Sequence, residues 1–318
     1  MASPPALARG TRWRRIAARV GGPLGAAALI FVVWNAVILL FRLKPFVLPT
    51  PQASIAVIFT NWSTLGGLTL QTITETVYGF FIGAAIGFVL AVAMAQLPVV
   101  QRLVYPALIA SQAVPIVAIA APLVILLGFG MVPKLILVAE IVFFPVVVNV
   151  LDGLAHIEPE VINLTRVLHA SSVRAFLLVR LPATLNPLFS GLKIGATYAV
   201  TGAVVGEWTA SSTSGLGTYL LTANSQLLTT AVYGATLLLT GIGLASFVLV
   251  TMAEHLATPW QTRSTARPWS RTARALRKAP ERTTEDSLAV PVTPGWPDEP
   301  QPGSHESAAY PAHKGARP

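Results

Sequence analysis

The sequence has no cysteine and few charged residues. Without cysteine, the chain forms no disulfide, no thiolate nucleophile and no Cys-ligated zinc or iron–sulfur site. Charged residues make up 11% of the chain, whereas a water-soluble domain averages about a quarter. In contrast, 53% of the residues are hydrophobic and the mean hydropathy is +0.65. This composition is typical of a membrane protein.

Nucleotide-binding and hydrolase motifs are also missing. No G-x-x-x-x-G-K-[ST] run occurs, so the chain has no P-loop to hold nucleotide phosphates. The patterns H-E-x-x-H, G-x-S-x-G and G-x-G-x-x-G are absent as well. We therefore expect no catalytic residue, no metal site and no cofactor on this chain. ATP and its Mg would have to be bound by a partner subunit.

Six apolar segments are long enough to cross a bilayer, which takes about 20 residues. They are 20–41, 77–94, 104–127, 135–154, 188–205 and 228–252. The third contains Pro106, Pro115 and Pro122, and proline is tolerated in a spanning helix where neighbours satisfy the freed carbonyls. The expected fold class is an all-α polytopic membrane protein with about six transmembrane helices.

Basic residues predict the orientation in the membrane. Five arginines and no acid precede the first apolar segment: Arg9, Arg12, Arg14, Arg15 and Arg19. Placing this end inside leaves three basic residues outside, which are Arg42, Lys44 and Lys134. The asymmetry predicts an even number of spans with both termini cytoplasmic. Anionic lipid headgroups account for the positive charge, so no nucleic-acid partner is expected.

The chain divides into five predicted regions. Residues 1–19 are a basic cytoplasmic N-terminus, 20–43 the first transmembrane helix, and 44–70 an outer loop. A short helix in this loop begins with Thr50 as N-cap and Pro51 in the first turn. Residues 71–256 form a transmembrane core, and the polar, proline-rich stretch 257–318 is expected to be a disordered cytoplasmic tail.

Small residues and one lysine mark the fifth apolar segment. Gly191, Gly195 and Gly202, together with Ala196 and Ala199, recur at a spacing that predicts close helix packing. Lys193 lies near the cytoplasmic end of this segment, where its side chain is expected to extend toward the headgroups.

Between the fourth and fifth apolar segments lies a semi-polar stretch, NLTRVLHASSVRAFLLVRLP, at residues 163–182. Its apolar residues recur at helical spacing in two short runs. The pair Ser171–Ser172 stands where the second helix would be capped, and Pro182 is expected to end the unit. We interpret the pattern as a helix–turn–helix on the cytoplasmic side that docks a soluble partner.

This stretch resembles the coupling loop of inner-membrane permeases of binding-protein-dependent ABC importers. In that family a Glu-Ala-Ala triplet is followed by a glycine six residues after the Glu, then by an aliphatic residue and Leu-Pro. Asn163, Leu164 and Thr165 occupy the triplet positions, and His169 occupies the glycine position. Val179, Leu181 and Pro182 match the ending. Asn163 and His169 depart from the family pattern. The flanking sequences are similar to the family too, so the resemblance covers roughly residues 65–256.

The resemblance implies a type I ABC importer permease in a bacterial cytoplasmic (inner) membrane. Two copies of the permease, as a homodimer, would assemble with two ATP-binding subunits and a periplasmic or lipid-anchored substrate-binding protein. The coupling helices at 157–181, including Val167, would sit in a groove of the ATPase and drive alternating access. One stretch of sequence is most similar to permeases for thiamine-precursor pyrimidines (hydroxymethylpyrimidine): GLKIGATYAVTGAVVGEW followed by SGLGTYLL. Riboflavin, taurine or alkanesulfonate, and nitrate are alternative substrates.

Glu140, Glu207 and Trp208 are the candidate residues of a translocation path. A carboxylate at bilayer depth costs about 2.5–3.5 kcal/mol on insertion scales, so Glu140 should face the bundle interior or a water-filled path. It would be either a gate residue or a packing residue at a dimer interface. Glu207 and Trp208 close the fifth segment, where they could contact a ligand. The alternative is an interfacial Trp anchor beside a water-exposed acid.

Two other classes of protein remain possible on the residues alone. A secondary transporter or channel without an ATPase would be favoured by paired acids and bases within the membrane, and only Glu140 stands clearly at bilayer depth. An intramembrane enzyme would need a Ser/His or di-Asp constellation. His156 and His169 lie in the cytoplasmic loop, which disfavours that interpretation.

Overall fold

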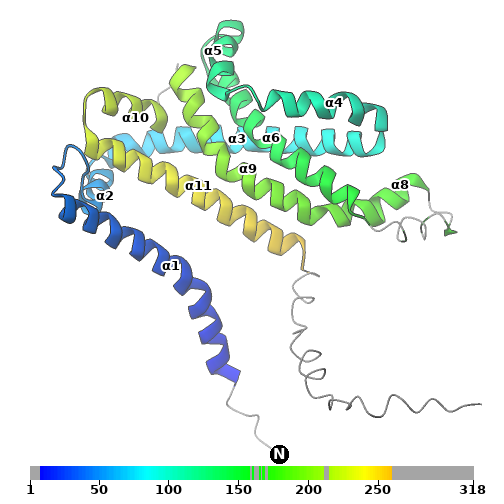
Figure 1. Ribbon diagram of the computed structural model, residues 1–318, viewed down its shortest axis with the longest axis horizontal. Helices are drawn as coiled ribbons and strands as arrows, with labels where there is room; N and C mark the ends of the chain where they lie inside the picture. Colours follow the sequence, from blue (N-terminus) through cyan, green and yellow to red (C-terminus); the bar gives the residue numbers. More distant parts are fainter. Residues whose placement is uncertain are drawn as a thin grey trace, which may run out of the picture. The chain divides into compact units, whose positions relative to one another are not determined.

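The structure, a computed structural model, describes residues 8–157, 160, 165, 167–168, 171–210 and 215–259. Over these residues the chain is helical and contains no strand, which confirms the expected all-α class. The helices are α1 Ala8–Phe41, α2 Pro51–Thr60, α3 Trp62–Gln96, α4 Pro98–Ser111, α5 Ile116–Leu127, α6 Met131–Ala155, α8 Ser172–Ala175, the π-helix η1 Phe176–Arg180, α9 Leu181–Thr209, α10 Leu216–Ser225 and α11 Thr229–Ala257 (Figure 1).

Helix α6 lies between α3 and α9, and glycines bring the backbones together. A Cβ added to Gly83 of α3 would lie 2.5 Å from the carbonyl oxygen of Ala139, and one on Gly87 would lie 2.7 Å from that of Phe143. From Gly83 to Gly87 the contacts move four residues forward on α3 and four residues forward on α6, so the two helices run parallel. This close approach leaves room only for glycine on the α3 side.

Helix α9 packs on α6 in the opposite direction. A Cβ on Gly191 would lie 2.9 Å from Cα of Val146, and one on Gly202 would lie 2.8 Å from Cα of Val138. The close packing predicted for this glycine stripe is confirmed. In the view of Figure 1, α3, α6, α9 and α11 extend along the same axis, and α9 also packs against α11.

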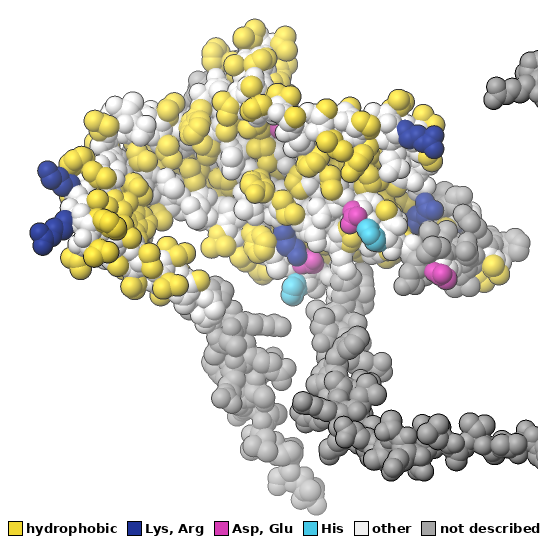
Figure 2. All heavy atoms as spheres, viewed as in Figure 1, with side chains coloured by type: hydrophobic (Ala, Val, Ile, Leu, Met, Phe, Trp, Pro, Cys, Tyr) yellow, Lys and Arg dark blue, Asp and Glu magenta, His cyan; other side chains and the backbone are white. Residues whose placement is uncertain are grey.

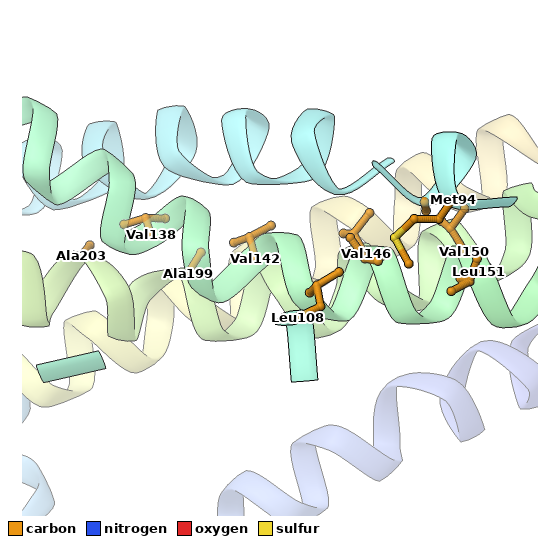
Figure 3. Close-up of a cluster of buried hydrophobic side chains, with 11 residues drawn as sticks. Met94, Leu108, Val138, Val142, Val146, Val150, Leu151, Ala199 and Ala203 are labelled. Carbon is orange, nitrogen blue, oxygen red and sulfur yellow. The ribbon is translucent and has the colours of Figure 1, made fainter. Parts of the chain in front are cut away.

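Valines of α6 fill the space between the flanking helices. Val138, Val142, Val146 and Val150 recur every four residues, and all are fully buried. They pack with Met94 of α3, Leu108 of α4 and alanines of α9 (Figure 3). A β-branched side chain has few rotamers to lose in a helix, so it fills a narrow glycine-lined gap at low entropic cost.

The third apolar segment is broken rather than continuous. Helix α4 ends at Ser111, α5 begins at Ile116, and the two meet at 101°. The break falls just before Pro115, whereas Pro106 and Pro122 lie inside helices. Because α3 and α6 are parallel, the chain between them must return along the bundle. Helices α4 and α5 make this return together.

Among the described residues, four helices are long and apolar enough to span a membrane: Trp62–Gln96, Met131–Ala155, Phe176–Thr209 and Thr229–Ala257. The bent pair α4–α5 would make a fifth span. The expected first span lies within α1. Over the described residues, the apolar stretch of α1, Gly25–Phe41, is shorter than each of these four helices. One face of the molecule is covered largely by hydrophobic side chains (Figure 2).

Helix α2 begins as the sequence predicts. The hydroxyl of Thr50 accepts a hydrogen bond from the N–H of Ala53 at 3.3 Å, and Pro51 stands in the first turn. Trp34 of α1 donates its indole N–H to the carbonyl of Pro49 at 3.2 Å and packs against Tyr233 of α11. These contacts join α1, α2 and α11. The predicted tail lies outside the described residues from residue 260 on.

Candidate functional site

We call residues 157–182 the predicted coupling segment, and its described part from 171 on lies at the end of the bundle that carries α8, the α8 end. The hydroxyl of Ser171 accepts from the N–H of Arg174 at 3.4 Å, and its carbonyl accepts from the N–H of Ala175 at 2.9 Å. The predicted helix cap at Ser171–Ser172 is therefore confirmed. Arg180 donates to the side-chain oxygen of Gln96 at 3.4 Å, which ties this segment to the end of α3.

The expectation that Pro182 ends the unit is wrong. Helices η1 and α9 form one continuous helix, Phe176–Thr209, of 34 residues. Pro182 lies in the first turn of α9, directly after a π turn in which Leu181 donates to the carbonyl of Phe176. The widened turn accommodates a residue that has no N–H to donate. At 1.5 Å per residue the helix extends about 50 Å, so it joins the coupling segment to the opposite end of the bundle.

The described residues of the coupling segment leave an apolar pair exposed. Val167 is 72% exposed and Leu168 69% exposed. Thr165, Val179 and Leu181 are half-buried, and Pro182 is exposed. The other predicted coupling residues, Asn163, Leu164 and His169, lie outside the described residues. The segment thus presents aliphatic surface next to a rigid helix.

A buried carboxylate organises the opposite end, which carries α10 and is called the α10 end below. Glu207 of α9 is 0% exposed. Its Oε1 accepts from the hydroxyl of Thr72 at 2.6 Å, and its Oε2 accepts from the N–H groups of Gly217 at 2.6 Å and Thr218 at 3.2 Å. These two N–H groups belong to the first turn of α10, where a negative charge also interacts favourably with the helix dipole. The expectation of a water-exposed acid at this position is wrong.

Two neighbours complete the attachment of α10. A Cβ on Gly215 would overlap the carboxylate of Glu207, so only glycine allows this approach. Trp208 donates its indole N–H to the carbonyl of Gly217 at 2.9 Å, and its side chain remains 42% exposed. Leu216 donates its N–H to the hydroxyl of Thr72 at 3.0 Å. Helix α10 is therefore held at its N-terminus by α3 and α9 together.

A buried ion pair lies close to Glu207. Lys134 of α6 and Glu75 of α3 are each 0% exposed, with 2.8 Å between Nζ and Oε1. Gln71 donates to the same oxygen of Glu75 at 2.8 Å. Glu75 is near enough to act electrostatically on Glu207. Lys134, which the basic-residue count assigns to the outer side, lies in the first turn of α6 and is enclosed by the bundle rather than open to water.

Sequence reasoning missed this polar cluster because it started the second span at residue 77. The structure begins α3 at Trp62, so Gln71, Thr72 and Glu75 lie within the helix. Their spacing of three and four residues puts them on one face, which was the available signal.

Glu140 lies apart from Glu207 and Trp208. It is half-buried and lines a hollow of about 350 Å³ between α3 and α6, together with Ile82, Ile86 and Phe143. The structure therefore does not bring the three candidate path residues together. Trp208 lines a different groove, between α9 and α11.

Lys193 does not extend freely toward the membrane surface. Its Nζ lies 2.7 Å from Oε2 of Glu254 on α11, and both side chains are largely buried. The pair joins α9 to α11 twelve residues after the start of α9 at Leu181. The predicted extension toward the headgroups is replaced by an interhelical ion pair.

Comparison with known proteins identifies the chain. Residues 83–258 match the family described as "Binding-protein-dependent transport system inner membrane component". The chain belongs to this family. The matched region contains α4 to α11, and thus the coupling segment, Glu140, Glu207 and the ion pair Lys193–Glu254. The permease is a type I ABC importer subunit, an inner membrane component with several apolar helices.

Individual relatives carry several different solute names. A probable ABC transporter permease protein of Haemophilus influenzae is 33% identical over 233 residues, which cover 73% of this chain and 95% of the relative. The formylaminopyrimidine transport permease protein ThiX of Halalkalibacterium halodurans is 28% identical, over 73% of this chain and 93% of the relative. The riboflavin transport system permease protein RibX of Chloroflexus aurantiacus is 32% identical, over 73% and 87%. The permease therefore serves an importer of small solutes.

The family match also decides between the classes that the residues left open. The buried pair Glu75–Lys134 is the kind of pairing that would favour a secondary transporter. Both side chains are fully enclosed, so they line no path in this conformation. Together with Glu207 they hold helices to one another, which suits a scaffold of a permease.

Proposed function

We propose that this permease imports a thiamine-precursor pyrimidine, delivered by an external binding protein and driven by ATPase subunits on separate chains. The observation that supports the driving mechanism is the exposed pair Val167–Leu168 beside the continuous helix Phe176–Thr209. An ATPase groove that took up this apolar pair would move one end of a helix whose other end holds Glu207. Hydrolysis, ATP and Mg would then reside on the ATPase subunits.

The proposed cycle follows from this geometry. Closure of two ATPase subunits moves the coupling segments of two permease copies, and each 34-residue helix carries the motion to the α10 end. There Glu207 holds α10, so α10 moves with α9 rather than independently. The pathway opens outward, the binding protein releases its solute, and hydrolysis restores the inward-facing state. We place the α10 end outside and both termini in the cytoplasm, as the basic residues favour.

The pyrimidine is favoured by the likeness to ThiX over most of both chains and by the text around Glu207. Alternative solutes are riboflavin, a taurine-type sulfonate or nitrate. RibX, the putative aliphatic sulfonates permease SsuC of Bacillus subtilis and the taurine permease TauC of Escherichia coli support the first two.

Co-purification tests the docking role. The double variant Leu164→Asp, Val167→Asp should release co-expressed ATPase subunits while the permease stays folded, because charge would replace the apolar contact. Val99→Asp is the matched control, since Val99 is 69% exposed but lies on α4. ATPase retained by the double variant at the level of this control would reject the docking role. Wild-type permease purified alone should hydrolyse no ATP.

Single-cysteine labelling tests the orientation. The chain has no native cysteine, so introduced ones are labelled without background. An impermeant maleimide on intact cells should label Ser212→Cys and Ser63→Cys and should not label Ser264→Cys. Labelling of Ser264→Cys from outside would reject cytoplasmic placement of the C-terminal region.

A further inference from the structure

The groove between α9 and α11 is lined mostly by apolar side chains, but it also contains three threonines. On α3, large apolar side chains are exposed, among them Leu70, Phe81 and Val89. Such side chains suit contact with lipid. On α9, exposed positions along one stripe are instead Thr197, Thr201 and Trp208. This stripe faces α11 and defines what we call the hydroxyl groove.

The hydroxyl groove has room for a small solute. Its volume is about 750 Å³, within the range of small-molecule sites. The α11 side contributes Thr240, Leu239, Leu244 and Phe247. Trp208 has its N–H bonded to Gly217, so the exposed part of its side chain offers ring surface rather than a donor. Two aromatic rings thus line the groove.

The threonines supply hydrogen-bond acceptors. Thr197 donates its hydroxyl to the carbonyl of Lys193 at 2.9 Å, and Thr240 donates to that of Thr236 at 2.8 Å. A hydroxyl has one donor and two lone pairs, so each oxygen can still accept from a bound group. Ring N–H and amino groups match such acceptors.

Charge at the groove is balanced internally. None of the residues that line the groove within the described part of the chain is charged. The nearest charges along α9 are Glu207, next to Trp208 and bonded to Thr72 and the first turn of α10, and Lys193, one turn from Thr197 and paired with Glu254 at 2.7 Å. An anionic solute would therefore enter without a cationic partner, at a high desolvation cost.

We propose that the hydroxyl groove is the part of the translocation path that contacts the solute, and that it selects uncharged planar heteroaromatic molecules over anions. The ring faces of Trp208 and Phe247 stack on the solute, while Thr197, Thr201 and Thr240 accept its N–H groups. This inference rests on the proposed importer function and adds to it the residues and the charge of the solute. It also places the path away from the hollow that contains Glu140.

Accessibility to an aqueous reagent tests the groove without any knowledge of the solute. Only a thiolate reacts with maleimide, and a thiol in lipid stays protonated and inert. Val138 supplies the depth reference, because added Cβ atoms on Gly79 and on Gly202 would both meet it. Tyr78 precedes Gly79, Thr201 precedes Gly202, and Tyr78 is exposed on α3. Tyr78→Cys is thus a control at the same depth as Thr201→Cys.

The measurement uses single-cysteine variants of the complete transporter in proteoliposomes. We expect maleimide to label Thr201→Cys and Thr197→Cys at least tenfold faster than Tyr78→Cys. Ile82→Cys reports on the hollow beside Glu140. Equal rates at Thr201 and Tyr78, or fast labelling at Ile82 with none at Thr201, would overturn the assignment of the path.

Uptake of two labelled probes, the uncharged formylaminopyrimidine and the anion ethanesulfonate, tests the selectivity. We expect uptake of the pyrimidine only, and Thr201→Val should lower it several-fold while ATP hydrolysis continues. If Thr201→Val leaves pyrimidine uptake unchanged and maleimide does not label the groove cysteines, the groove is not the solute path. The importer function would remain intact in that case. Ethanesulfonate uptake through a labelled groove would reject the charge selectivity, and with it the pyrimidine assignment.

Discussion

Replacing Glu207 should reveal how much of the α10 end depends on one carboxylate. In Glu207→Ala the N–H groups of Gly217 and Thr218 lose their acceptor, and Thr72 loses the acceptor of its hydroxyl. Thr72 can turn to the carbonyl of Leu68, 3.2 Å away. Two buried N–H groups then remain unpaired, at about 1–3 kcal/mol each.

The lost helix–dipole interaction and the cavity add to this cost. We therefore expect a loss of about 3–5 kcal/mol in the free energy of unfolding for Glu207→Ala. Glu207→Gln keeps one oxygen for the two N–H groups and turns its amide toward Thr72. Because only charge assistance is lost, about 1 kcal/mol is expected.

Thermal unfolding of the detergent-solubilised permease, followed by tryptophan fluorescence, measures the effect, and Trp208 reports locally. Glu160→Ala is the matched control, since Glu160 is exposed, and it should not move the midpoint. A midpoint for Glu207→Ala equal to that of the control would refute the role of this carboxylate. Equal losses for Glu207→Gln and Glu207→Ala would show that charge, rather than the number of acceptors, holds α10.

Three further predictions concern the buried pair, the glycine beside Glu207 and the coupling corner. Lys134→Met should destabilise the protein by about 3–5 kcal/mol because it leaves Glu75 charged and unpaired, and adding Glu75→Leu should recover most of this loss in a double-mutant thermal-unfolding cycle. Additive losses would show that the two side chains do not interact. Gly215→Ala should displace α10 and lower the unfolding midpoint, whereas in a Glu207→Ala background the same change should cost much less, because the overlap is gone. A cost independent of the background would contradict the contact. His169→Gly restores the family residue and should keep part of the transport, while His169→Asp should uncouple ATP hydrolysis from uptake; wild-type coupling in His169→Asp, with both rates measured in proteoliposomes, would show that this corner transmits no force.

Local features of the fold were predictable from the sequence because their causes are local. Thr50 and Ser171 cap helices through groups three or four residues away. The glycines of α9 predicted close packing because any side chain there would meet a neighbouring backbone. The place of the coupling motif stays a prediction from spacing, and its positions Asn163 and His169, which depart from the family pattern, lie outside the described residues.

The candidate site was predictable only in part, because local sequence does not identify distant partners. Trp208 was identified and lines a groove, yet the residues opposite it on α11 were not foreseen. Pro182 was taken as a helix end, since a proline usually disfavours the preceding helical residue. The π turn before it, which allows the helix to continue, has no signature in the residues themselves.

The sequence by itself determined that the chain is an all-α membrane protein of the importer-permease type, because composition, hydropathy and motif spacing carry that information. Only the tertiary structure decided which charged residues are buried and which groups they pair with. Lys134 and Glu75 are 59 positions apart, and Thr72 and Glu207 are 135 apart. A lone charge is costly within an apolar bundle, and a partner reduces that cost only when the packing of α3, α6 and α9 brings the two groups within hydrogen-bonding distance. That packing, set by glycines against valines, encloses Glu207, for which the sequence also allowed a water-exposed position, and makes it the attachment of α10.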